Sequence, residues 1–292
     1  MLRIELLIDA KAALGEGPLW DVTEQRLYWI DSFGNKVHRC DAAGRDRRSW
    51  DLPKNIGSMA LRETGGAVCS LRDGFYALDF ETGALEKIAD PDPGQPRLRM
   101  NDGKVDRQGR FVAGYMDDEE RDPLCKLFRL DPDLSTHELD RDIICSNGPC
   151  WSRDGRTFYF ADTSRRTIYA YDYDTSTGGV SNKRRFADFE ALGLSGFPDG
   201  ATVDEEDHVW SAEVYRGRLV RLSPDGKLDR VVGLPVASAT SISFGGSDLD
   251  IAYVTSMARP IDGVLPKERE AGGVFAIHGL GVRGLPEPRF AG

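Results

Sequence analysis

The sequence has 292 residues, of which 40% are hydrophobic and 29% are charged, and its formal net charge is −10. This length is ample for a sizeable core, but it does not decide between one large domain and two small ones. The acidic balance argues against a nucleic-acid partner, which would need a basic face, and no apolar run approaches membrane-spanning length.

The first segment, MLRIELLIDAKAALGEGP, contains Glu5 and Asp9, so it does not resemble the apolar part of a secretory signal. We expect residues 4–8 to form a first strand instead. The five cysteines are odd in number and form no CxxC pair, which argues against a disulfide framework and against a thiolate zinc site. Together these features predict a soluble, cytoplasmic protein with reduced thiols.

Short runs typical of β-strands dominate the rest of the chain. They are rich in aromatic and β-branched residues and are bounded by Asp, Gly, Asn and Pro; examples are residues 26–30, 75–78, 158–160, 168–171 and 219–222. No 3.6-residue apolar period is sustained over a helical length. The strongest helical candidate, residues 186–194, is short and ends near Gly196 and Pro198.

A fixed order of features recurs at a spacing of roughly 40 to 50 residues, the range of propeller blades. Each copy has an inner strand led by a small residue, then a turn, an aromatic-rich strand and a third strand. The leading residues are Gly17, Gly57, Gly103, Gly148, Gly200 and Ser241. Six copies predict an all-β fold, a six-bladed β-propeller that forms a single domain over residues 1–292. We expect the N-terminal strand to complete the last blade, near residues 272–277, and to close the ring.

Oxygen-bearing side chains precede the leading glycine in four of the copies. In a propeller the first strand of each blade lines the central channel, so equivalent positions form a ring at one rim. We therefore expect the oxygens of these side chains to converge. The four copies contribute Glu16, Asn101 with Asp102, Asn147 and Asp199, the sixth contributes Thr240 and Ser241, and the second offers only Ile56 and Ser58.

Two carboxylates and an amide carbonyl in a narrow channel predict a bound cation, because without one they repel each other and lose hydration. The all-oxygen donor set favours a hard divalent ion such as Ca²⁺, Mg²⁺ or Mn²⁺; Zn²⁺ also fits, although it is better matched to nitrogen and sulfur. Three protein ligands leave positions open for water and substrate, which makes the ion a candidate catalyst. The histidines fall in or beside outer strands and turns, so we do not expect metal ligands among His38, His137, His208 and His278.

Segments in blade order resemble the SMP-30/gluconolactonase/regucalcin-like family over nearly the whole chain. They are LGEGPLW, RMNDGKVDRQGRFVAGYM, SNGPCW with FYFADT, FPDGATVDEEDHVW and TSISFGG. The resemblance implies a six-bladed propeller that hydrolyses a sugar lactone with one divalent metal ion. It identifies as metal ligands Glu16, Asn147 and Asp199, the last also as general base, and as the groups that hold the lactone Arg99, Asn101 and Glu119.

In the implied mechanism the ion polarises the lactone carbonyl and stabilises the oxyanion. A water deprotonated by Asp199 or by the metal attacks the carbonyl, and the ring oxygen leaves. Arg99 donates to substrate oxygens and Glu119 accepts from hydroxyls, in an acidic pocket that suits a neutral polyol ring. Two residues depart from the family pattern: Tyr115, where a small residue is frequent, and Pro149, where an aliphatic residue is common. Tyr115 bears on the size of the pocket.

Two other functions remain open. A metal-dependent esterase for non-sugar lactones would need an apolar rim, whereas the loops around Arg99 and Glu119 are polar. A calcium-binding or docking propeller would expose aromatic residues on one face, whereas the connections 117–123 and 258–270 contain none. We expect the partner to be a small-molecule sugar lactone, with no nucleic acid and no membrane, and the protein to be a monomer or weak homo-oligomer. The residues do not name the sugar or the native ion.

Overall fold

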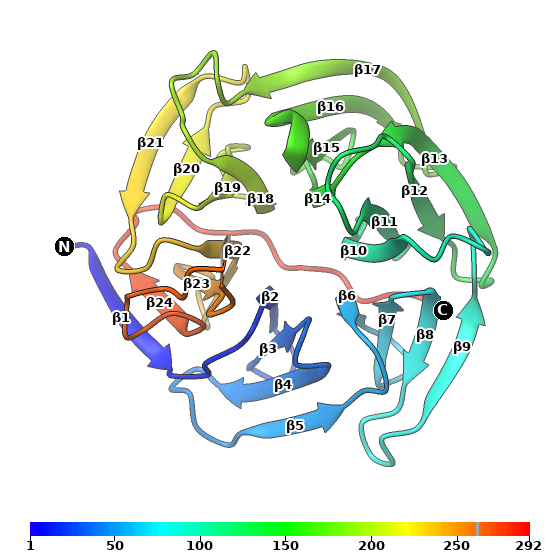
Figure 1. Ribbon diagram of the computed structural model, residues 1–292, viewed down its shortest axis with the longest axis horizontal. Helices are drawn as coiled ribbons and strands as arrows, with labels where there is room; N and C mark the ends of the chain where they lie inside the picture. Colours follow the sequence, from blue (N-terminus) through cyan, green and yellow to red (C-terminus); the bar gives the residue numbers. More distant parts are fainter. Residues whose placement is uncertain (261–262) are drawn as a thin grey trace.

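The computed structural model describes residues 1–260 and 263–292. Six four-stranded sheets form a ring, so the protein is a six-bladed β-propeller, as predicted (Figure 1). Among the described residues the only helix is the 3-10 turn η1 (Thr163–Arg165). The helical candidate at residues 186–194 is instead the end of a strand followed by turns. No helix in the described ranges is both long enough and apolar enough to cross a membrane.

The blades follow the order of the chain, and each runs outward from the channel. The first three are β2 (Gly15–Asp21), β3 (Arg26–Asp31), β4 (Lys36–Asp41) and β5 (Arg48–Asp51); β6 (Ile56–Leu61), β7 (Ala67–Leu71), β8 (Gly74–Leu78) and β9 (Leu85–Ala89); and β10 (Leu98–Val105), β11 (Phe111–Asp117), β12 (Cys125–Leu130) and β13 (Thr136–Ile143). The last three are β14 (Ser146–Trp151), β15 (Thr157–Asp162), β16 (Thr167–Asp174) and β17 (Gly179–Asp188); β18 (Phe197–Val203), β19 (Val209–Val214), β20 (Arg218–Leu222) and β21 (Leu228–Gly233); and β22 (Ala239–Gly245), β23 (Ile251–Ser256), β24 (Val274–His278) and β1 (Arg3–Ile8).

The N-terminal strand closes the ring, which confirms the prediction. Strand β1 pairs antiparallel with β24, from Arg3 opposite His278 to Ile8 opposite Val274. It is the outermost strand of the sixth blade, whose other three strands come from the opposite end of the chain. Ring closure therefore depends on hydrogen bonds between segments that are far apart in sequence.

Aromatic side chains pack between neighbouring blades. Trp20 of β2 stacks on Tyr253 of β23, with ring centroids 5.6 Å apart. Trp210 of β19 meets Phe244 of β22 edge-on at 6.0 Å. Such rings bury a large apolar area and add a favourable aromatic contact. This packing holds the blades against one another and so fixes the spacing of the inner strands around the channel.

All six inner strands share a β-bulge near the leading residue of the repeat. The pairing register shifts between residues 16 and 19, 56 and 58, 100 and 103, 147 and 150, 198 and 201, and 239 and 241. A bulge leaves a residue outside the ladder and re-aims its side chain. Gly148 adopts a φ of +57°, which favours glycine. A Cβ on Gly200 would lie 2.1 Å from Oγ of Ser241 in the next blade. The narrow, bulged channel wall therefore explains why glycine recurs.

The C-terminal segment crosses the ring near its centre (Figure 1, red). The N–H of Phe290 donates to the carbonyl of Leu61 in β6 at 2.8 Å. The Arg107 guanidinium donates to the carbonyl of Pro286 at 3.0 Å, which ties the segment to the third blade. The N–H of Glu205, in the fifth blade, donates to the carbonyl of Arg283 at 2.8 Å, so the segment links blades on different sides of the channel.

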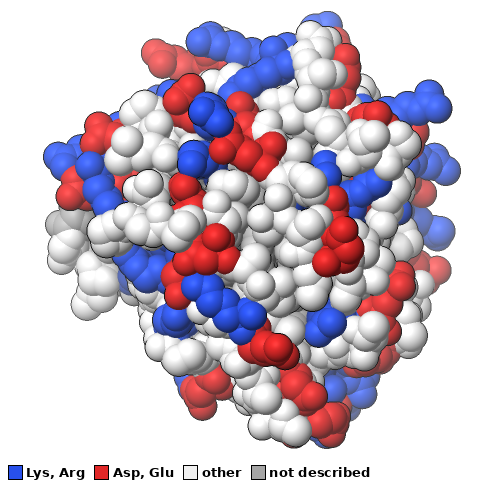
Figure 2. All heavy atoms as spheres, turned by 90° about the vertical axis from the view of Figure 1, so that its right-hand side faces the viewer, with Lys and Arg blue, Asp and Glu red and all other residues white. Residues whose placement is uncertain are grey.

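Acidic and basic side chains alternate on the side of the molecule shown in Figure 2. Many of the surface charges are paired locally: Lys126 lies 2.8 Å from Asp92, and Lys87 lies 3.1 Å from Asp90. Exposed pairs of this kind contribute little to stability. They leave no broad basic patch on this face.

Candidate active site

A cavity lies where the bulged parts of the inner strands meet, with about 440 Å³ of empty space that is partly open to solvent. Strands from four blades contribute polar groups to its wall. Five of the six predicted site residues line this cavity: Glu16, Arg99, Asn101, Asn147 and Asp199. The repeat therefore does bring distant polar side chains to one place.

Glu16 and Asp199 carry charges that the interior of the channel disfavours. Burial, and then repulsion from Asp199 and Asp102, raises the pKa of the Glu16 carboxyl well above its usual value. Burial and repulsion from Asp102 do the same to the pKa of Asp199. Each carboxylate accepts a hydrogen bond from the N–H of the following glycine, at 3.3 Å for Glu16 and 3.1 Å for Asp199. One N–H group does not neutralise a carboxylate, and neither Glu16 nor Asp199 forms an ion pair within the described residues.

A relay of hydrogen bonds fixes the orientation of the Asn147 amide. Its Nδ2 donates to Oγ1 of Thr163 at 2.8 Å, and the Thr163 hydroxyl donates to the carbonyl of Pro198 at 2.8 Å. Because that hydroxyl donates its only hydrogen to the Pro198 carbonyl, it can only accept a hydrogen bond from Asn147. This keeps the amide nitrogen of Asn147 directed toward Thr163. The Oδ1 of Asn147 accepts from Nδ2 of Asn101 at 3.0 Å, which leaves it a further lone pair.

Arg99 and Asn101 form the wall that β10 contributes. The guanidinium Nη1 of Arg99 donates to Oδ1 of Asn101 at 2.8 Å. The side chain of Arg99 is only 4% exposed, and its Nε lies 3.5 Å from a carboxylate oxygen of Asp118. Burial lowers the pKa of Arg99, but an arginine stays protonated in proteins. The wall therefore offers a fixed positive charge to a ligand.

The structure places Glu119 outside the cavity and Glu120 on its lining. Asp117 at the end of β11 accepts hydrogen bonds from three backbone N–H groups of the following loop and from Arg97. The loop therefore folds around the carboxylate of Asp117. Glu119 is exposed and pairs with Arg121, whereas Glu120 adopts a φ of +53° at the cavity rim.

Tyr115 does not line the cavity. Its side chain is 2% exposed, and its ring meets that of Phe128 edge-on at 6.0 Å. Because successive side chains of a strand point to opposite faces, the next residue, Met116, faces the cavity. The bulky residue at position 115 therefore fills the interior of the blade and does not narrow the pocket.

Sequence reasoning missed a second group of lining residues, which follow the second strand of a blade. Strands one and two of a blade are antiparallel, so the end of the second lies beside the start of the first. A search for polar residues just after each second strand would have found them. Three blades contribute in this way: the fourth with Thr163, the fifth with Tyr215 and the sixth with Arg259.

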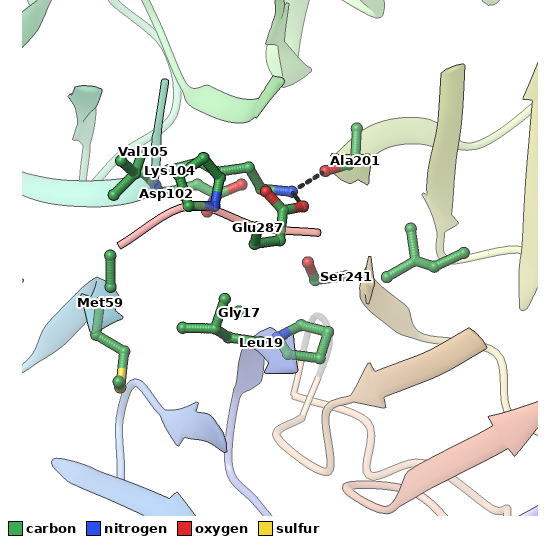
Figure 3. Close-up of a pocket in the computed structure, with 14 residues that line it drawn as sticks. Gly17, Leu19, Met59, Asp102, Lys104, Val105, Ala201, Ser241 and Glu287 are labelled. Atoms are coloured by element: carbon green, nitrogen blue, oxygen red, sulfur yellow. Dashed lines mark hydrogen bonds and ion pairs between the residues drawn. The ribbon is translucent and has the colours of Figure 1, made fainter. Parts of the chain in front are cut away.

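A second cavity lies farther along the same inner strands, with about 430 Å³ of empty space that is partly open to solvent (Figure 3). The Nζ of Lys104 donates to the carbonyl of Ala201 at 3.0 Å and lies 2.9 Å from the carboxylate of Glu287 in the C-terminal segment. Burial opposes ionisation of Glu287, but the charges of Lys104 and Arg107 hold its pKa below the usual value. The C-terminal segment thus lines this part of the channel, away from Glu16 and Asp199.

The oxygens of Glu16, Asn147 and Asp199 fit a hard divalent cation. A cation would offset the two disfavoured carboxylate charges, and the Thr163 relay holds the amide oxygen on the side away from that hydroxyl. Within the described residues, no group of three or more His, Cys, Asp or Glu side chains is arranged to hold a metal. A site here therefore needs Asn147 as a third protein ligand.

Comparisons with known proteins find relatives that match nearly the whole chain. Residues 14–258 match the family model described as the SMP-30/Gluconolactonase/LRE-like region. The chain is 37% identical over 298 residues to regucalcin of Xenopus laevis, covering 100% of this chain and 99% of that protein. It is 35% identical over 290 residues to 6-deoxy-6-sulfogluconolactonase of Pseudomonas putida, covering 99% of each. The solved structure of a calcium-binding protein, regucalcin, from Agrobacterium tumefaciens has a TM-score of 0.90 and 26% identity, over 98% of this chain and 96% of that chain.

Replacing Thr163 with Val should weaken binding of a divalent cation. A methyl group cannot accept from Nδ2 of Asn147, so the amide loses the contact that orients its oxygen. Loss of a partner that orients a metal ligand lowers affinity by about 10- to 100-fold, which isothermal titration calorimetry with Ca²⁺ and Mn²⁺ measures. Thr163→Ser keeps the hydroxyl and should stay near wild type. Equal affinities for wild type and Thr163→Val would show that Thr163 does not orient the ligand.

Without divalent ions, Glu16→Gln should stabilise the protein at alkaline pH. Because folding raises the pKa of Glu16 above 4.5, the folded state binds this proton more tightly than the unfolded state. The wild type then loses unfolding free energy as pH rises through the raised pKa, and the variant loses less. Urea titrations in a chelator at about pH 5 and about pH 8 measure this difference. Glu119→Gln, an exposed change of the same charge, is the control; identical pH slopes for all three proteins would contradict the account.

Proposed function

The chain belongs to the SMP-30/Gluconolactonase/LRE-like family, and from this premise we propose that it hydrolyses a sugar lactone to the aldonic acid. The name of the 6-deoxy-6-sulfogluconolactonase relative supports a lactonase-type hydrolase. The observation that carries the proposal is the meeting of Glu16, Asn147, Asp199 and Arg99 in one cavity. These groups can hold a polar ring and accept a proton. Most of the lining residues are polar or charged, which favours a polyol lactone over an ester with a long acyl chain.

We propose that Glu16, Asn147 and Asp199 hold one divalent cation, with Ca²⁺, Mg²⁺, Mn²⁺ and Zn²⁺ as candidates. A cation bound there would polarise the lactone carbonyl and stabilise the charge that develops on its oxygen. Burial of both carboxyls beside other negative charges raises their pKa values and supports the site, because a bound cation would favour the ionised forms that the cavity otherwise disfavours. The calcium-binding relative of Agrobacterium tumefaciens makes Ca²⁺ a natural first ion to test.

Asp199 is the proposed general base. In its ionised form it accepts a proton from the water that attacks the carbonyl. It then returns the proton to the ring oxygen as the bond from that oxygen to the carbonyl carbon breaks. Over these steps the lactone and one water molecule give the hydroxy acid.

Arg99, Asn101 and Glu120 are proposed to hold the sugar. Arg99 donates to substrate oxygens. Both hydrogens of Asn101 Nδ2 are already used, one on the Ser146 carbonyl at 2.8 Å and one on Asn147 at 3.0 Å. Asn101 therefore meets the substrate through Oδ1, as an acceptor from a hydroxyl. Glu120 takes the hydroxyl-accepting role that the resemblance assigned to Glu119, because Glu120 is the residue on the cavity lining.

The cytoplasm is the proposed location. All five cysteines are free and buried, which fits a reducing compartment. The proposed partner is a small-molecule lactone.

The experiment is proton release from a panel of sugar lactones at near-neutral pH, with a chelator and with each divalent ion. The ion-loaded wild type should accelerate ring opening, and the chelator should abolish this. Asp199→Ala should lower kcat by at least about 100-fold while the circular dichroism spectrum stays unchanged. Asp225→Ala, in an exposed turn, is the control.

Full turnover by Asp199→Ala would remove this residue from the mechanism. A wild type that binds an ion by calorimetry but opens no lactone would instead be a calcium-binding propeller.

A further inference from the structure

Two arginines from different blades face one aromatic ring at the edge of the cavity. The guanidinium carbon of Arg99 lies 5.4 Å, and that of Arg259 5.1 Å, from the ring centroid of Phe33. Phe33 follows β3 and is 40% exposed, and both arginines line the cavity. A guanidinium over an aromatic face is attracted to the ring and keeps its N–H groups available. We call the three residues Phe33, Arg99 and Arg259 the arginine wall.

The two guanidiniums of the arginine wall differ in how far the protein uses them. Arg99 is engaged by Asp118 at 3.5 Å and by Asn101 at 2.8 Å. Arg259 has no carboxylate oxygen within 4.0 Å among residues 1–260 and 263–292, and its Nε is buried without a hydrogen-bond partner. Among the described residues Arg259 therefore lacks the paired carboxylate that Arg99 has in Asp118, although its charge opposes the rise in the pKa of Asp199 and of Tyr215.

The position of Arg259 is fixed by the backbone. The N–H of Ala258 donates to the carbonyl of Ala12 at 2.9 Å, and that of Arg259 donates to the carbonyl of Ala13 at 3.2 Å. Residues 12 and 13 lead directly into β2, which carries Glu16. Arg259 is thus tied to the strand that supplies a proposed metal ligand, so its place relative to the carboxylates is set by the fold.

The carboxylates of the cavity do not account for this cation. Glu16 and Asp199 are the proposed ligands of a divalent ion, whose two positive charges offset theirs. Asp102 accepts N–H groups from Gly103 and Gly148, each at 2.8 Å. Glu120 also lines the cavity, but among the described residues no carboxylate oxygen, including those of Glu120, lies within 4.0 Å of Arg259. With an ion bound by Glu16 and Asp199, Arg259 therefore remains as an unpaired positive charge on the cavity wall.

We infer that the arginine wall binds an anionic group of the substrate, so that the lactone carries a carboxylate or a sulfonate in addition to its ring ester. The inference rests on the proposed function, because it names the class of lactone. A guanidinium offers parallel N–H donors that match two oxygens of such a group. This conclusion departs from the neutral polyol that the acidic sequence led us to expect.

The first test compares glucono-lactone, glucaro-lactone and 6-deoxy-6-sulfogluconolactone on the ion-loaded protein. In wild type, kcat/KM should be at least about 10-fold higher for one of the anionic lactones than for the neutral one. Arg259→Gln should lower kcat/KM for that lactone by about 10- to 100-fold, chiefly through KM, and change the neutral one by less than about twofold. Arg216→Gln, an exposed change of the same charge outside the cavity, should leave all three unchanged.

The two anionic lactones distinguish a carboxylate subsite from a sulfonate subsite. A wild type that prefers the neutral lactone, or an Arg259→Gln variant that affects charged and neutral lactones alike, would overturn the inference.

Binding of ligands that contain no lactone separates this inference from the lactonase proposal. Calorimetry with methyl glucoside, methyl glucuronide and methyl 6-deoxy-6-sulfoglucoside compares a neutral ring with one that bears a carboxylate and one that bears a sulfonate. One charged ring should bind wild type at least about 10-fold more tightly than the neutral ring, and Arg259→Gln should remove that difference. If no lactone is opened and the difference persists, the lactonase proposal fails and the anionic subsite stands. If neither charged ring binds more tightly than the neutral one, the subsite is absent.

Discussion

The repulsion between Glu16 and Asp199 is the constraint on which the site depends. The two carboxylates come from the first and fifth blades, and burial together with neighbouring negative charge raises the pKa of both. Nothing local requires them to be near each other; the packing of the blades around the channel does. The ring is held by contacts such as Trp20 on Tyr253 and by the pairing of β1 with β24. The fold thus maintains an unfavourable charge arrangement that a divalent cation would relieve.

The bulged inner strands convert a structural repeat into a binding site. Each bulge interrupts the ladder at the same place, so the side chains beside it turn toward the channel. The segments after the second strands return to the same end of each blade and complete the cavity with Thr163, Tyr215 and Arg259. The first group supplies charge and the oxygens proposed to bind a metal ion. In the second group, Thr163 orients the Asn147 amide. At the other end of the strands, Lys104 and Glu287 join the channel wall to the C-terminal segment.

The architecture and much of the cavity followed from the sequence because both obey the period of the repeat. The position before the leading glycine predicted that Glu16, Asn147 and Asp199 would meet in one cavity, as they do. Glu119 and Glu120 could not be separated in this way, because they lie in a loop whose path is set by hydrogen bonds to Asp117 and not by strand alternation. Arg259 was missed because its place depends on backbone contacts with the chain's first loop. Donor type alone also does not select one ion, since all of the hard divalent ions prefer oxygen.

The central claim is that the carboxylates and the oriented amide form one coordination site in the channel. Crystals grown with Ca²⁺ and measured for anomalous scattering test it most directly. The account predicts one ion in the cavity, with oxygens of Glu16, Asn147 and Asp199 at about 2.3–2.6 Å from it. A cavity without an ion at saturating Ca²⁺, or an ion bound elsewhere while these three side chains keep their positions, would contradict it.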